Sequence, residues 1–185
     1  MNTSKRLLGA ALLLGLTMLP LRPACAASAS EINREATAAL KMLYRNNEAA
    51  RLVGEQAKAV LIFPSVGKAG FIVGGQYGNG ALRKQGKTVG YYNTVAGSFG
   101  LQAGVQKFGY ALFFMTDSAL SYLDKSGGWE IGTGPSVVVV DTGFAKSLTS
   151  TTLRDDVYAF IFDQKGLMAG IGLQGSKITK IHPDK

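Results

Sequence analysis

The stretch AKAVLIFPSVGKAGFIVGGQYGNGAL, which runs from Ala57 to Leu82, decides the fold. It opens with an apolar run over residues 59–63, whose length suits a buried strand better than a buried helix. Pro64 is predicted to end that strand, because proline donates no hydrogen bond to a β-ladder. Residues 65–68 then read as a turn with Lys68 at its exit. The glycines and apolar residues that follow predict a second strand or hairpin with sharp bends or close backbone approaches.

The first 26 residues are predicted to be a secretory signal peptide that is cleaved from the mature protein. Two basic residues precede an apolar run over residues 7–19, and residues 24–26 supply an A-x-A cleavage site. The run is short for a membrane-spanning helix, although a retained anchor helix is the alternative. Cleavage after Ala26 leaves a single domain, residues 27–185, and we expect that domain in the periplasm or otherwise at the cell envelope.

Cys25 is the only cysteine, and it raises a second possibility for the N-terminus: attachment of a lipid at a bacterial lipobox. Such a site needs small or apolar residues just before the cysteine, and Arg22 and Pro23 fit poorly. We therefore favour cleavage after Ala26 over lipidation. The mature protein then has no cysteine and no disulfide.

The charge of the chain favours an anionic partner. The full sequence has a net charge of +8, and loss of the first 26 residues leaves 17 basic and 12 acidic residues, a net charge of +5. A moderately basic protein is attracted to anionic surfaces. The sequence has no long basic run or RNA-binding signature, and an exported protein rarely meets nucleic acid. We therefore exclude nucleic acid as a partner.

Two helices are predicted before the first strand. Ser28 and Glu31 have the spacing of a capping box, and apolar residues recur at helical spacing from Ser30 to about Arg45. A second, short helix is predicted over residues 48–56. The apolar face of the first helix is modest, so we expect it to cover one face of a sheet. A helix that lies on a membrane surface is the alternative.

The rest of the chain predicts short strands joined by glycine-rich turns. Residues 81–95 form a hairpin with a basic tip, and a second hairpin over residues 97–115 is predicted to break at residues 107–109. Asp117 can cap a short helix that ends at Lys125. The further predicted segments are a strand over 137–140, a surface loop over 142–155, a strand over 158–162, a turn over 164–166, and strands over 167–173 and 176–181.

These elements favour one fold class, because hairpin connections are typical of antiparallel sheets. We expect an α+β fold: a mainly antiparallel, strongly curved sheet or partly closed β-barrel with two or three helices packed on it. Three segments, around Gly74, Gly100 and Gly170, carry glycines two or four residues apart on one strand face. Such a face could admit another layer or a ligand, and strong curvature of the sheet, which we favour, explains the same spacing.

The scarcity of reactive side chains excludes catalytic and metal chemistry. The only histidine, His182, lies near the C-terminus, and the only cysteine is predicted to be removed. Neither a catalytic triad nor a zinc site can then be assembled. The adjacent Asp155 and Asp156 point to opposite sides of an extended chain, so they do not form an acid–base pair. We expect no enzymatic activity, no metal and no cofactor.

Basic side chains beside apolar residues are the remaining candidate site. Such a surface suits an anionic lipid, with basic side chains at the head group and aromatic side chains toward the acyl region. Lysines that only solvate the rim of the sheet are the alternative. The predicted head-group residues are Lys58, Lys68, Arg83, Lys84, Lys87 and Lys107, and the predicted apolar contacts are Phe63, Phe71 and Phe108.

Three glycine-patterned blocks also give the chain a resemblance to a known family. The blocks are LIFPSVGKAGFIVGGQYGNG (61–80), GSFGLQAGVQ (97–106) and GLMAGIGLQG (166–175). Together they resemble the signature of the SYLF (Ysc84-like) lipid-binding domain family, across residues 35–181. The resemblance implies binding of phospholipids, and eukaryotic members are associated with phosphoinositides and some with actin. Among the matched positions, only Lys68 has the chemistry of a head-group contact.

The chain departs from eukaryotic members in its predicted signal peptide and in lacking an SH3 or FYVE module. We therefore expect its partner to be an anionic phospholipid of a bacterial membrane. Two other classes of function stay open. The glycine-lined face or a sheet edge could bind a protein partner or a second copy of the chain, as an envelope interaction or structural module. A closed barrel could instead carry an apolar ligand inside it.

Overall fold

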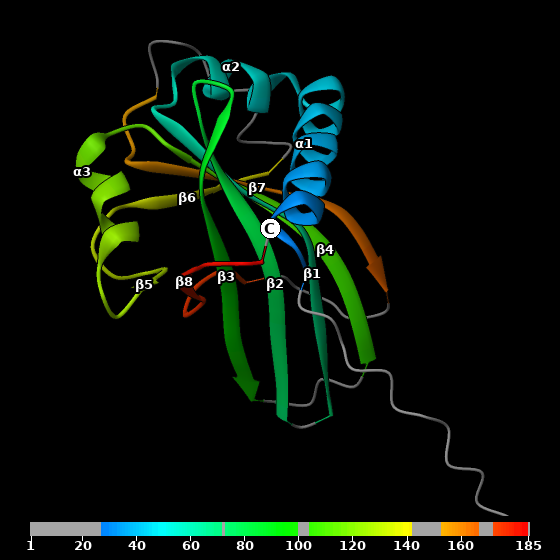
Figure 1. Ribbon diagram of the computed structural model, residues 1–185. Helices are drawn as coiled ribbons and strands as arrows, with labels where there is room; N and C mark the ends of the chain where they lie inside the picture. The colour runs from blue at the N-terminus through cyan, green and yellow to red at the C-terminus, as the bar shows by residue number, and fades with distance from the viewer. Residues whose placement is uncertain (1–26, 72, 100–103, 142–152, 167–171, 185) are drawn as a thin grey trace, which may run out of the picture.

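The computed structural model describes residues 27–71, 73–99, 104–141, 153–166 and 172–184. The predicted signal peptide, Cys25, most of the predicted loop over 142–155 and the glycines around Gly170 lie outside these residues. Figure 1 shows the arrangement of the chain. Its elements are α1 (Ala29–Asn46), α2 (Glu48–Gln56), β1 (Ala59–Phe71), β2 (Val73–Lys84), β3 (Lys87–Phe99), β4 (Gly104–Phe114), α3 (Asp117–Leu120), a 3₁₀ helix η1 (Ser121–Asp124), β5 (Trp129–Glu130), β6 (Val137–Val140), β7 (Val157–Gly166) and β8 (Lys177–Ile181).

The first helix begins where its capping residues predict. Ser28 is the N-cap of α1, and its hydroxyl accepts a hydrogen bond of 3.2 Å from the backbone N–H of Glu31. This bond satisfies one of the N–H groups that have no partner within a helix. The helix ends at Asn46, one residue beyond the predicted Arg45.

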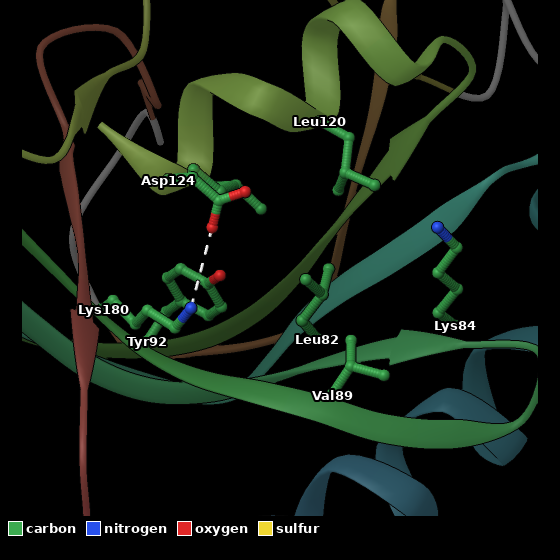
Figure 2. Close-up of a pocket in the computed structure, with 8 residues that line it drawn as sticks. Leu82, Lys84, Val89, Tyr92, Leu120, Asp124 and Lys180 are labelled. Carbon is green, nitrogen blue, oxygen red and sulfur yellow. Dashed lines mark ion pairs between the residues drawn. The ribbon is translucent and has the colours of Figure 1, made fainter. Parts of the chain in front are cut away.

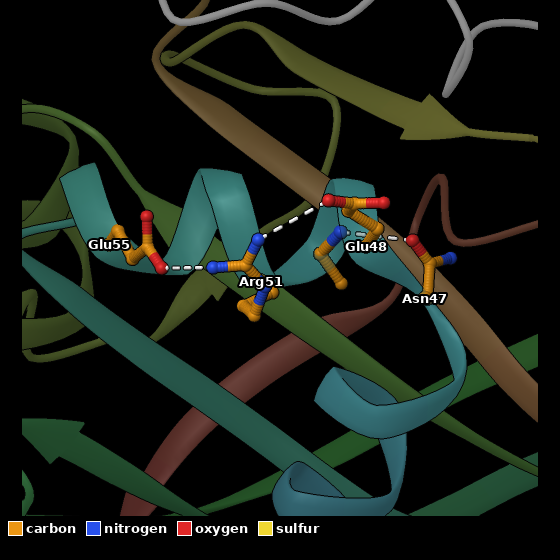
Figure 3. A network of polar contacts seen from close by, with 5 residues as sticks. Asn47, Glu48, Arg51 and Glu55 are labelled. Carbon is orange, nitrogen blue, oxygen red and sulfur yellow. Dashed lines mark hydrogen bonds and ion pairs between the residues drawn. The ribbon is translucent and has the colours of Figure 1, made fainter.

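The second helix has the predicted bounds. The Asn47 side chain caps it by accepting a hydrogen bond of 2.9 Å from the backbone N–H of Ala50. On its exposed side, Arg51 pairs with Glu55 at 2.6 Å and with Glu48 at 3.3 Å, as Figure 3 shows. Pairs three and four residues apart support a helix of only nine residues, which packing must also stabilise.

Within the described residues, the strands form one sheet of eight strands in the order β5-β8-β3-β2-β1-β4-β7-β6. Every pairing is antiparallel except that of β6 with β7, which is parallel. The sheet curls strongly into a half-barrel (Figure 1). The predicted fold class, an α+β protein with a mainly antiparallel and strongly curved sheet, is confirmed.

The prediction that Pro64 ends the first strand is wrong. β1 continues from Ala59 to Phe71, and its register shifts by one residue at Pro64 against both neighbouring strands. The shift is a β-bulge, in which one extra residue stays outside the ladder and a proline costs no ladder hydrogen bond. Residues 65–68 are therefore strand, and Lys68 lies within the sheet and not at a turn.

Two other predicted turns are also strand. The expected break at residues 107–109 is absent, because β4 runs through it and pairs with β1 and β7. The predicted hairpin over residues 97–115 does not form, since β3 and β4 lie three places apart in the sheet. The predicted turn over residues 164–166 belongs to β7, whose bulge falls at Asp163, a residue with φ of 51°.

The two faces of the sheet are covered by different helices. One face, here called the α3 face, buries Leu61, Phe63 and Tyr110 against α3, η1, Trp129 and Leu173. The other, here called the α1 face, buries alternate residues of the same strands against α1 and α2. The apolar side of α1 thus packs on the sheet, as the favoured sequence prediction has it. No helix among the described residues is long and apolar enough to cross a membrane.

Curvature explains two glycines of β2, Gly78 and Gly80. A Cβ at Gly78 would lie 2.8 Å from the backbone oxygen of Ser65, and a Cβ at Gly80 would meet the backbone oxygen of Ile62. Both contacts fall beside the β1 bulge, where the two strands approach closely. The glycines on this face therefore permit the bend, which agrees with the favoured prediction.

Candidate functional site

The six predicted head-group residues lie in two separate groups. Four of them surround the start of β1 and the hairpin between β2 and β3. The other two, Lys68 and Lys107, lie toward the opposite end of the same strands. Arg83 pairs with Val60 near the start of β1, and Lys68 lies eight residues further along the same strand. At the usual rise per residue, Lys68 is therefore about 26 Å from the level of Arg83. The structure therefore does not bring all six charges to one place.

The hairpin tip presents two lysines to solvent. Lys84 and Lys87 are paired across the turn, and both side chains are exposed. The turn consists of Gln85 and Gly86, which have φ of 50° and 76°. Two residues with positive φ give the turn that suits the twist of a two-residue hairpin. Lys58, also exposed, lies at the start of β1 at the same end of the sheet.

Arg83 is held inside a polar network and not directed to solvent. Its guanidinium donates hydrogen bonds to Asn33 Oδ1 at 2.7 Å, Thr37 Oγ1 at 3.1 Å and Thr88 Oγ1 at 2.9 Å. A fourth bond of 3.0 Å goes to the backbone oxygen of Gly86. Arg83 thus joins α1 to the hairpin and fixes the position of the lysines beside it.

A pocket of about 270 Å³ opens beside the hairpin on the α3 face. Figure 2 shows Lys84 across the pocket from Lys180, which pairs with Asp124 at 3.6 Å. Lys84 forms no ion pair within the described part of the chain. The wall between the lysines is apolar and consists of Leu82, Val89, Leu120 and Leu123, with Tyr92 beside them. Burial and the nearby Asp124 carboxylate raise the pKa of Tyr92 to about 12.

A second pocket, of about 380 Å³, lies on the α1 side of the hairpin. Lys58 and Arg83 line it together with Glu55 and the apolar residues of α1, α2 and β1. Burial, together with the Glu55 carboxylate, raises the pKa of Tyr44 in its wall. The hairpin base is therefore flanked by a pocket on each face of the sheet, and each pocket combines basic and apolar side chains.

Lys68 and Lys107 lie on opposite faces of the sheet. Lys68 is on the α3 face with only 9% of its surface exposed, between Gln76 of β2 and Gln106 of β4. Lys107 is the next residue along β4 and is exposed on the α1 face. A buried lysine flanked by two buried glutamines is a different environment from a basic turn.

The aromatic residues predicted to contact lipid are placed elsewhere. Phe63 and Phe108 are buried in the core of the α3 face, where both rings pack on Tyr110. The side chain of Phe71 lies outside the described part of the structure. Four exposed apolar residues lie on the α1 face, toward the ends of the strands remote from the hairpin. They are Val73, Tyr77, Val95 and Val105, each 45–71% exposed. Val89, beside the hairpin, and Val139 of β6 are also exposed.

The acidic pair has a structural role. Asp156 accepts hydrogen bonds from the backbone N–H and the hydroxyl of Ser136, and Asp155 accepts one from the hydroxyl of Tyr158. Among the described residues, no group of three or more His, Cys, Asp or Glu side chains could hold a metal ion.

One sequence signal marks the six basic residues more simply than the motifs do. Residues 56–116, which include all of β1 to β4, contain no aspartate or glutamate, and their six basic residues are the six predicted head-group residues. The central strands therefore carry six positive charges with no acid among them. Sequence reasoning missed Lys180, Gln76 and Gln106, because only the strand register shows what they face.

Comparison with known families agrees with the resemblance found in the sequence. Residues 95–183 match the family Ysc84, described as "Las17-binding protein actin regulator". The matched region runs from the middle of β3 through β8. The glycine block at residues 61–80 lies before it. No curated protein matches the chain.

Proposed function

We propose, from the premise that this chain belongs to the Ysc84 (SYLF) family of binding domains, that it is a non-enzymatic domain which binds anionic phospholipid at a bacterial cell envelope. The observation that carries the proposal is the hairpin end of the sheet. There Lys58, Lys84 and Lys87 are exposed together, and Arg83 holds the hairpin in place. The surface pairs these charges with two pockets that have apolar walls.

The charges at this end are sufficient for measurable membrane binding. Each basic residue near an anionic membrane contributes about 1 kcal/mol. Three exposed lysines then contribute on the order of 3 kcal/mol, roughly a hundredfold in affinity. Because the lysines are exposed, salt at physiological strength and above screens much of this attraction.

The size of the pockets limits what they can hold. Volumes of about 270 and 380 Å³ lie near the lower end of the roughly 300–1,000 Å³ usual for ligand sites. Such pockets suit a head group and the first carbons of its chains better than two complete acyl chains. We infer that the protein binds lipid while the lipid stays in its membrane.

The sequence of residues 1–26 supports the proposed location at the envelope. Their basic, apolar and A-x-A segments predict export with cleavage after Ala26. A protein outside the cytoplasm meets the outer surface of the inner membrane or the inner surface of an outer membrane. The expected partner is therefore a bacterial anionic phospholipid, and neither actin nor a phosphoinositide.

The test is co-sedimentation of the chain from Ala27 with anionic or zwitterionic vesicles, at low and high salt. We expect pelleting with anionic vesicles only, weakened by salt and by the double variant Lys84→Glu/Lys87→Glu. The control variant Lys165→Glu/Lys177→Glu changes the net charge equally at two exposed positions remote from the hairpin. Equal loss in both variants would show that net charge alone binds the membrane, and no pelleting would exclude peripheral lipid binding.

A second candidate function is supported by the exposed apolar residues of the α1 face. Tyr77 pairs with Val95 across β2 and β3, and small residues such as Gly67 and Gly75 lie beside them. Exposed apolar side chains gathered on one sheet face commonly mark a site of protein association. If a second copy of the chain covers it, sedimentation equilibrium will show a dimer that Tyr77→Lys dissociates. A monomer at all concentrations excludes this function for the surface.

A further inference from the structure

Three buried polar side chains lie side by side on the α3 face of the sheet. Lys68 of β1 is directly opposite Gln76 of β2 and directly opposite Gln106 of β4. Residues paired across antiparallel strands point to the same face, with their Cβ atoms about 4.5–5.5 Å apart. All three are buried. The three side chains therefore form a compact polar cluster. This cluster is separate from the hairpin end of the sheet.

A fourth residue closes one side of this cluster. Gln76 Nε2 donates a hydrogen bond of 2.8 Å to the hydroxyl of Ser176, which is fully buried. Ser176 is itself held in place, since its backbone oxygen accepts a hydrogen bond from Ile131 N at 3.0 Å. The cluster is thus fixed by contacts between segments far apart in the sequence, as a preformed site requires.

Lys68 has no counter-charge in the described part of the chain. It forms no ion pair or hydrogen bond there, and residues 56–116 contain no acid. A charge that is mostly removed from water and has no partner is costly. Lys68 Nζ is not among the unpartnered polar atoms that are wholly enclosed, so part of it still faces solvent. An anionic group bound at Nζ would supply the missing charge.

Gln106 adds a second requirement. Its side-chain oxygen, Oε1, is wholly buried and accepts no hydrogen bond among the described residues. An unpaired buried acceptor costs about 1–3 kcal/mol. Because Oε1 is enclosed, a ligand reaches it only when the Gln106 side chain turns toward Lys68. A ligand that then satisfies both neighbours combines an anionic oxygen for Lys68 with a hydroxyl that donates to Gln106.

We propose that Lys68, Gln76, Gln106 and Ser176 form a binding site for an oxyanion that carries a neighbouring hydroxyl, the chemistry of a phosphoglycerol group. The site is distinct from the hairpin end and goes beyond the function proposed for that end. A phosphoglycerol group occurs on soluble glycerol phosphates and as the head group of an anionic phospholipid. The chemistry at Lys68 is the same for both sources.

Calorimetric titration of the chain from Ala27 tests the soluble source, with glycerol 3-phosphate, inorganic phosphate and glycerol as probes. We expect glycerol 3-phosphate to bind more tightly than phosphate, and glycerol not to bind. Lys68→Met should weaken binding of glycerol 3-phosphate at least about tenfold, the loss expected for one hydrogen bond to a charged group. Gln106→Leu should remove the preference over phosphate. Lys107→Met, the exposed neighbour on the other face, should change neither.

Vesicles of phosphatidylglycerol, compared with vesicles of phosphatidylserine at equal charge, test the membrane-bound source. If the site takes a lipid head group, Lys68→Met will weaken binding to phosphatidylglycerol selectively, and Lys107→Met will not. If Lys68→Met fails to fold, Gln106→Leu is used in its place, both for glycerol 3-phosphate against phosphate and for phosphatidylglycerol against phosphatidylserine. The proposal is overturned if no soluble probe binds and neither Lys68→Met nor Gln106→Leu changes the preference between the two lipids. The double variant Lys84→Glu/Lys87→Glu tests the hairpin end and leaves the Lys68 site unchanged. Its result therefore bears only on the proposed function, and the Lys68 and Gln106 variants bear only on this site.

Discussion

Arg83 Nη1 and Asn33 Oδ1 lie 2.7 Å apart, in a hydrogen bond that joins the β2–β3 hairpin to α1. The same guanidinium also reaches Thr37 on α1 and Thr88 on β3. The next residue, Lys84, is exposed and has no ion pair among the described residues. Two adjacent basic residues therefore have different roles, one in stability and the other at the candidate surface.

Replacement of Arg83 by methionine should destabilise the fold. The change leaves polar groups of the Asn33, Thr37 and Thr88 network without their charged donor, which costs about 1–3 kcal/mol in the free energy of unfolding. Urea denaturation of the purified variant measures this cost. Lys84→Met is the matched control and should change stability by no more than about 0.5 kcal/mol, as exposed substitutions usually do. Equal stability of the two variants would contradict the structural role of Arg83.

Single lysine substitutions at the hairpin end should lower vesicle affinity by similar amounts. Lys58→Met, Lys84→Met and Lys87→Met each remove one exposed charge, so each should weaken binding to anionic vesicles about fivefold, the equivalent of about 1 kcal/mol. Binding isotherms at two salt concentrations measure both the loss and its screening. Lys177→Met, at the far side of the sheet, should have a smaller effect. If all four variants lose the same affinity, the hairpin is not the binding surface.

The helices and the hairpin could be predicted because their signals are local. Ser28 and Asn47 cap α1 and α2 from positions next to each helix, and the turn at Gln85 and Gly86 directly joins two neighbouring strands. The strand end predicted at Pro64 is wrong, because the sequence does not distinguish a proline that ends a strand from one that lies in a β-bulge. Only the pairing of β1 with strands on both sides distinguishes them.

The candidate site was predictable in part for the same reason. The exposure of Lys84 and Lys87 follows from a basic turn, whereas the burial of Lys68 depends on the register of three strands. The basic residues near Phe63 and Phe108 in the sequence predict a lipid-facing position for both rings. Their burial comes from α3, η1 and the segments around Trp129 and Leu173, which cover that face of the sheet from later in the chain.

The close contact between β2 and the β1 bulge predicts opposite effects for two glycine substitutions. A Cβ at Gly80 would meet the backbone oxygen of Ile62 and the ring of Phe63. Because backbone cannot move aside easily, Gly80→Ala should cost about 1–3 kcal/mol of stability. Gly67→Ala adds a Cβ with no atom within 4 Å, and should be neutral or stabilise by up to about 1 kcal/mol. Thermal unfolding of both variants checks the difference, and equal melting temperatures would contradict it.

Tyr92 should make the protein less stable at alkaline pH. Burial and the Asp124 carboxylate raise its pKa from 10.0 to about 12. Below pH 10, tyrosine is protonated in the folded and the unfolded chain, and Tyr92 adds no pH dependence. Between pH 10 and about 12 the unfolded chain releases this proton and the folded chain keeps it, so rising pH favours unfolding.

Two variants isolate this effect from the titration of other groups at high pH. Tyr92→Phe removes the ionisable group, so its free energy of unfolding should fall less steeply than that of the wild type between pH 10 and about 12. Asp124→Asn removes the second cause of the raised pKa, so the tyrosinate absorbance of the folded protein should appear at lower pH. Urea midpoints measured across this range test the first expectation. If wild type and Tyr92→Phe lose stability in parallel, the buried hydroxyl of Tyr92 does not control the alkaline limit of this fold.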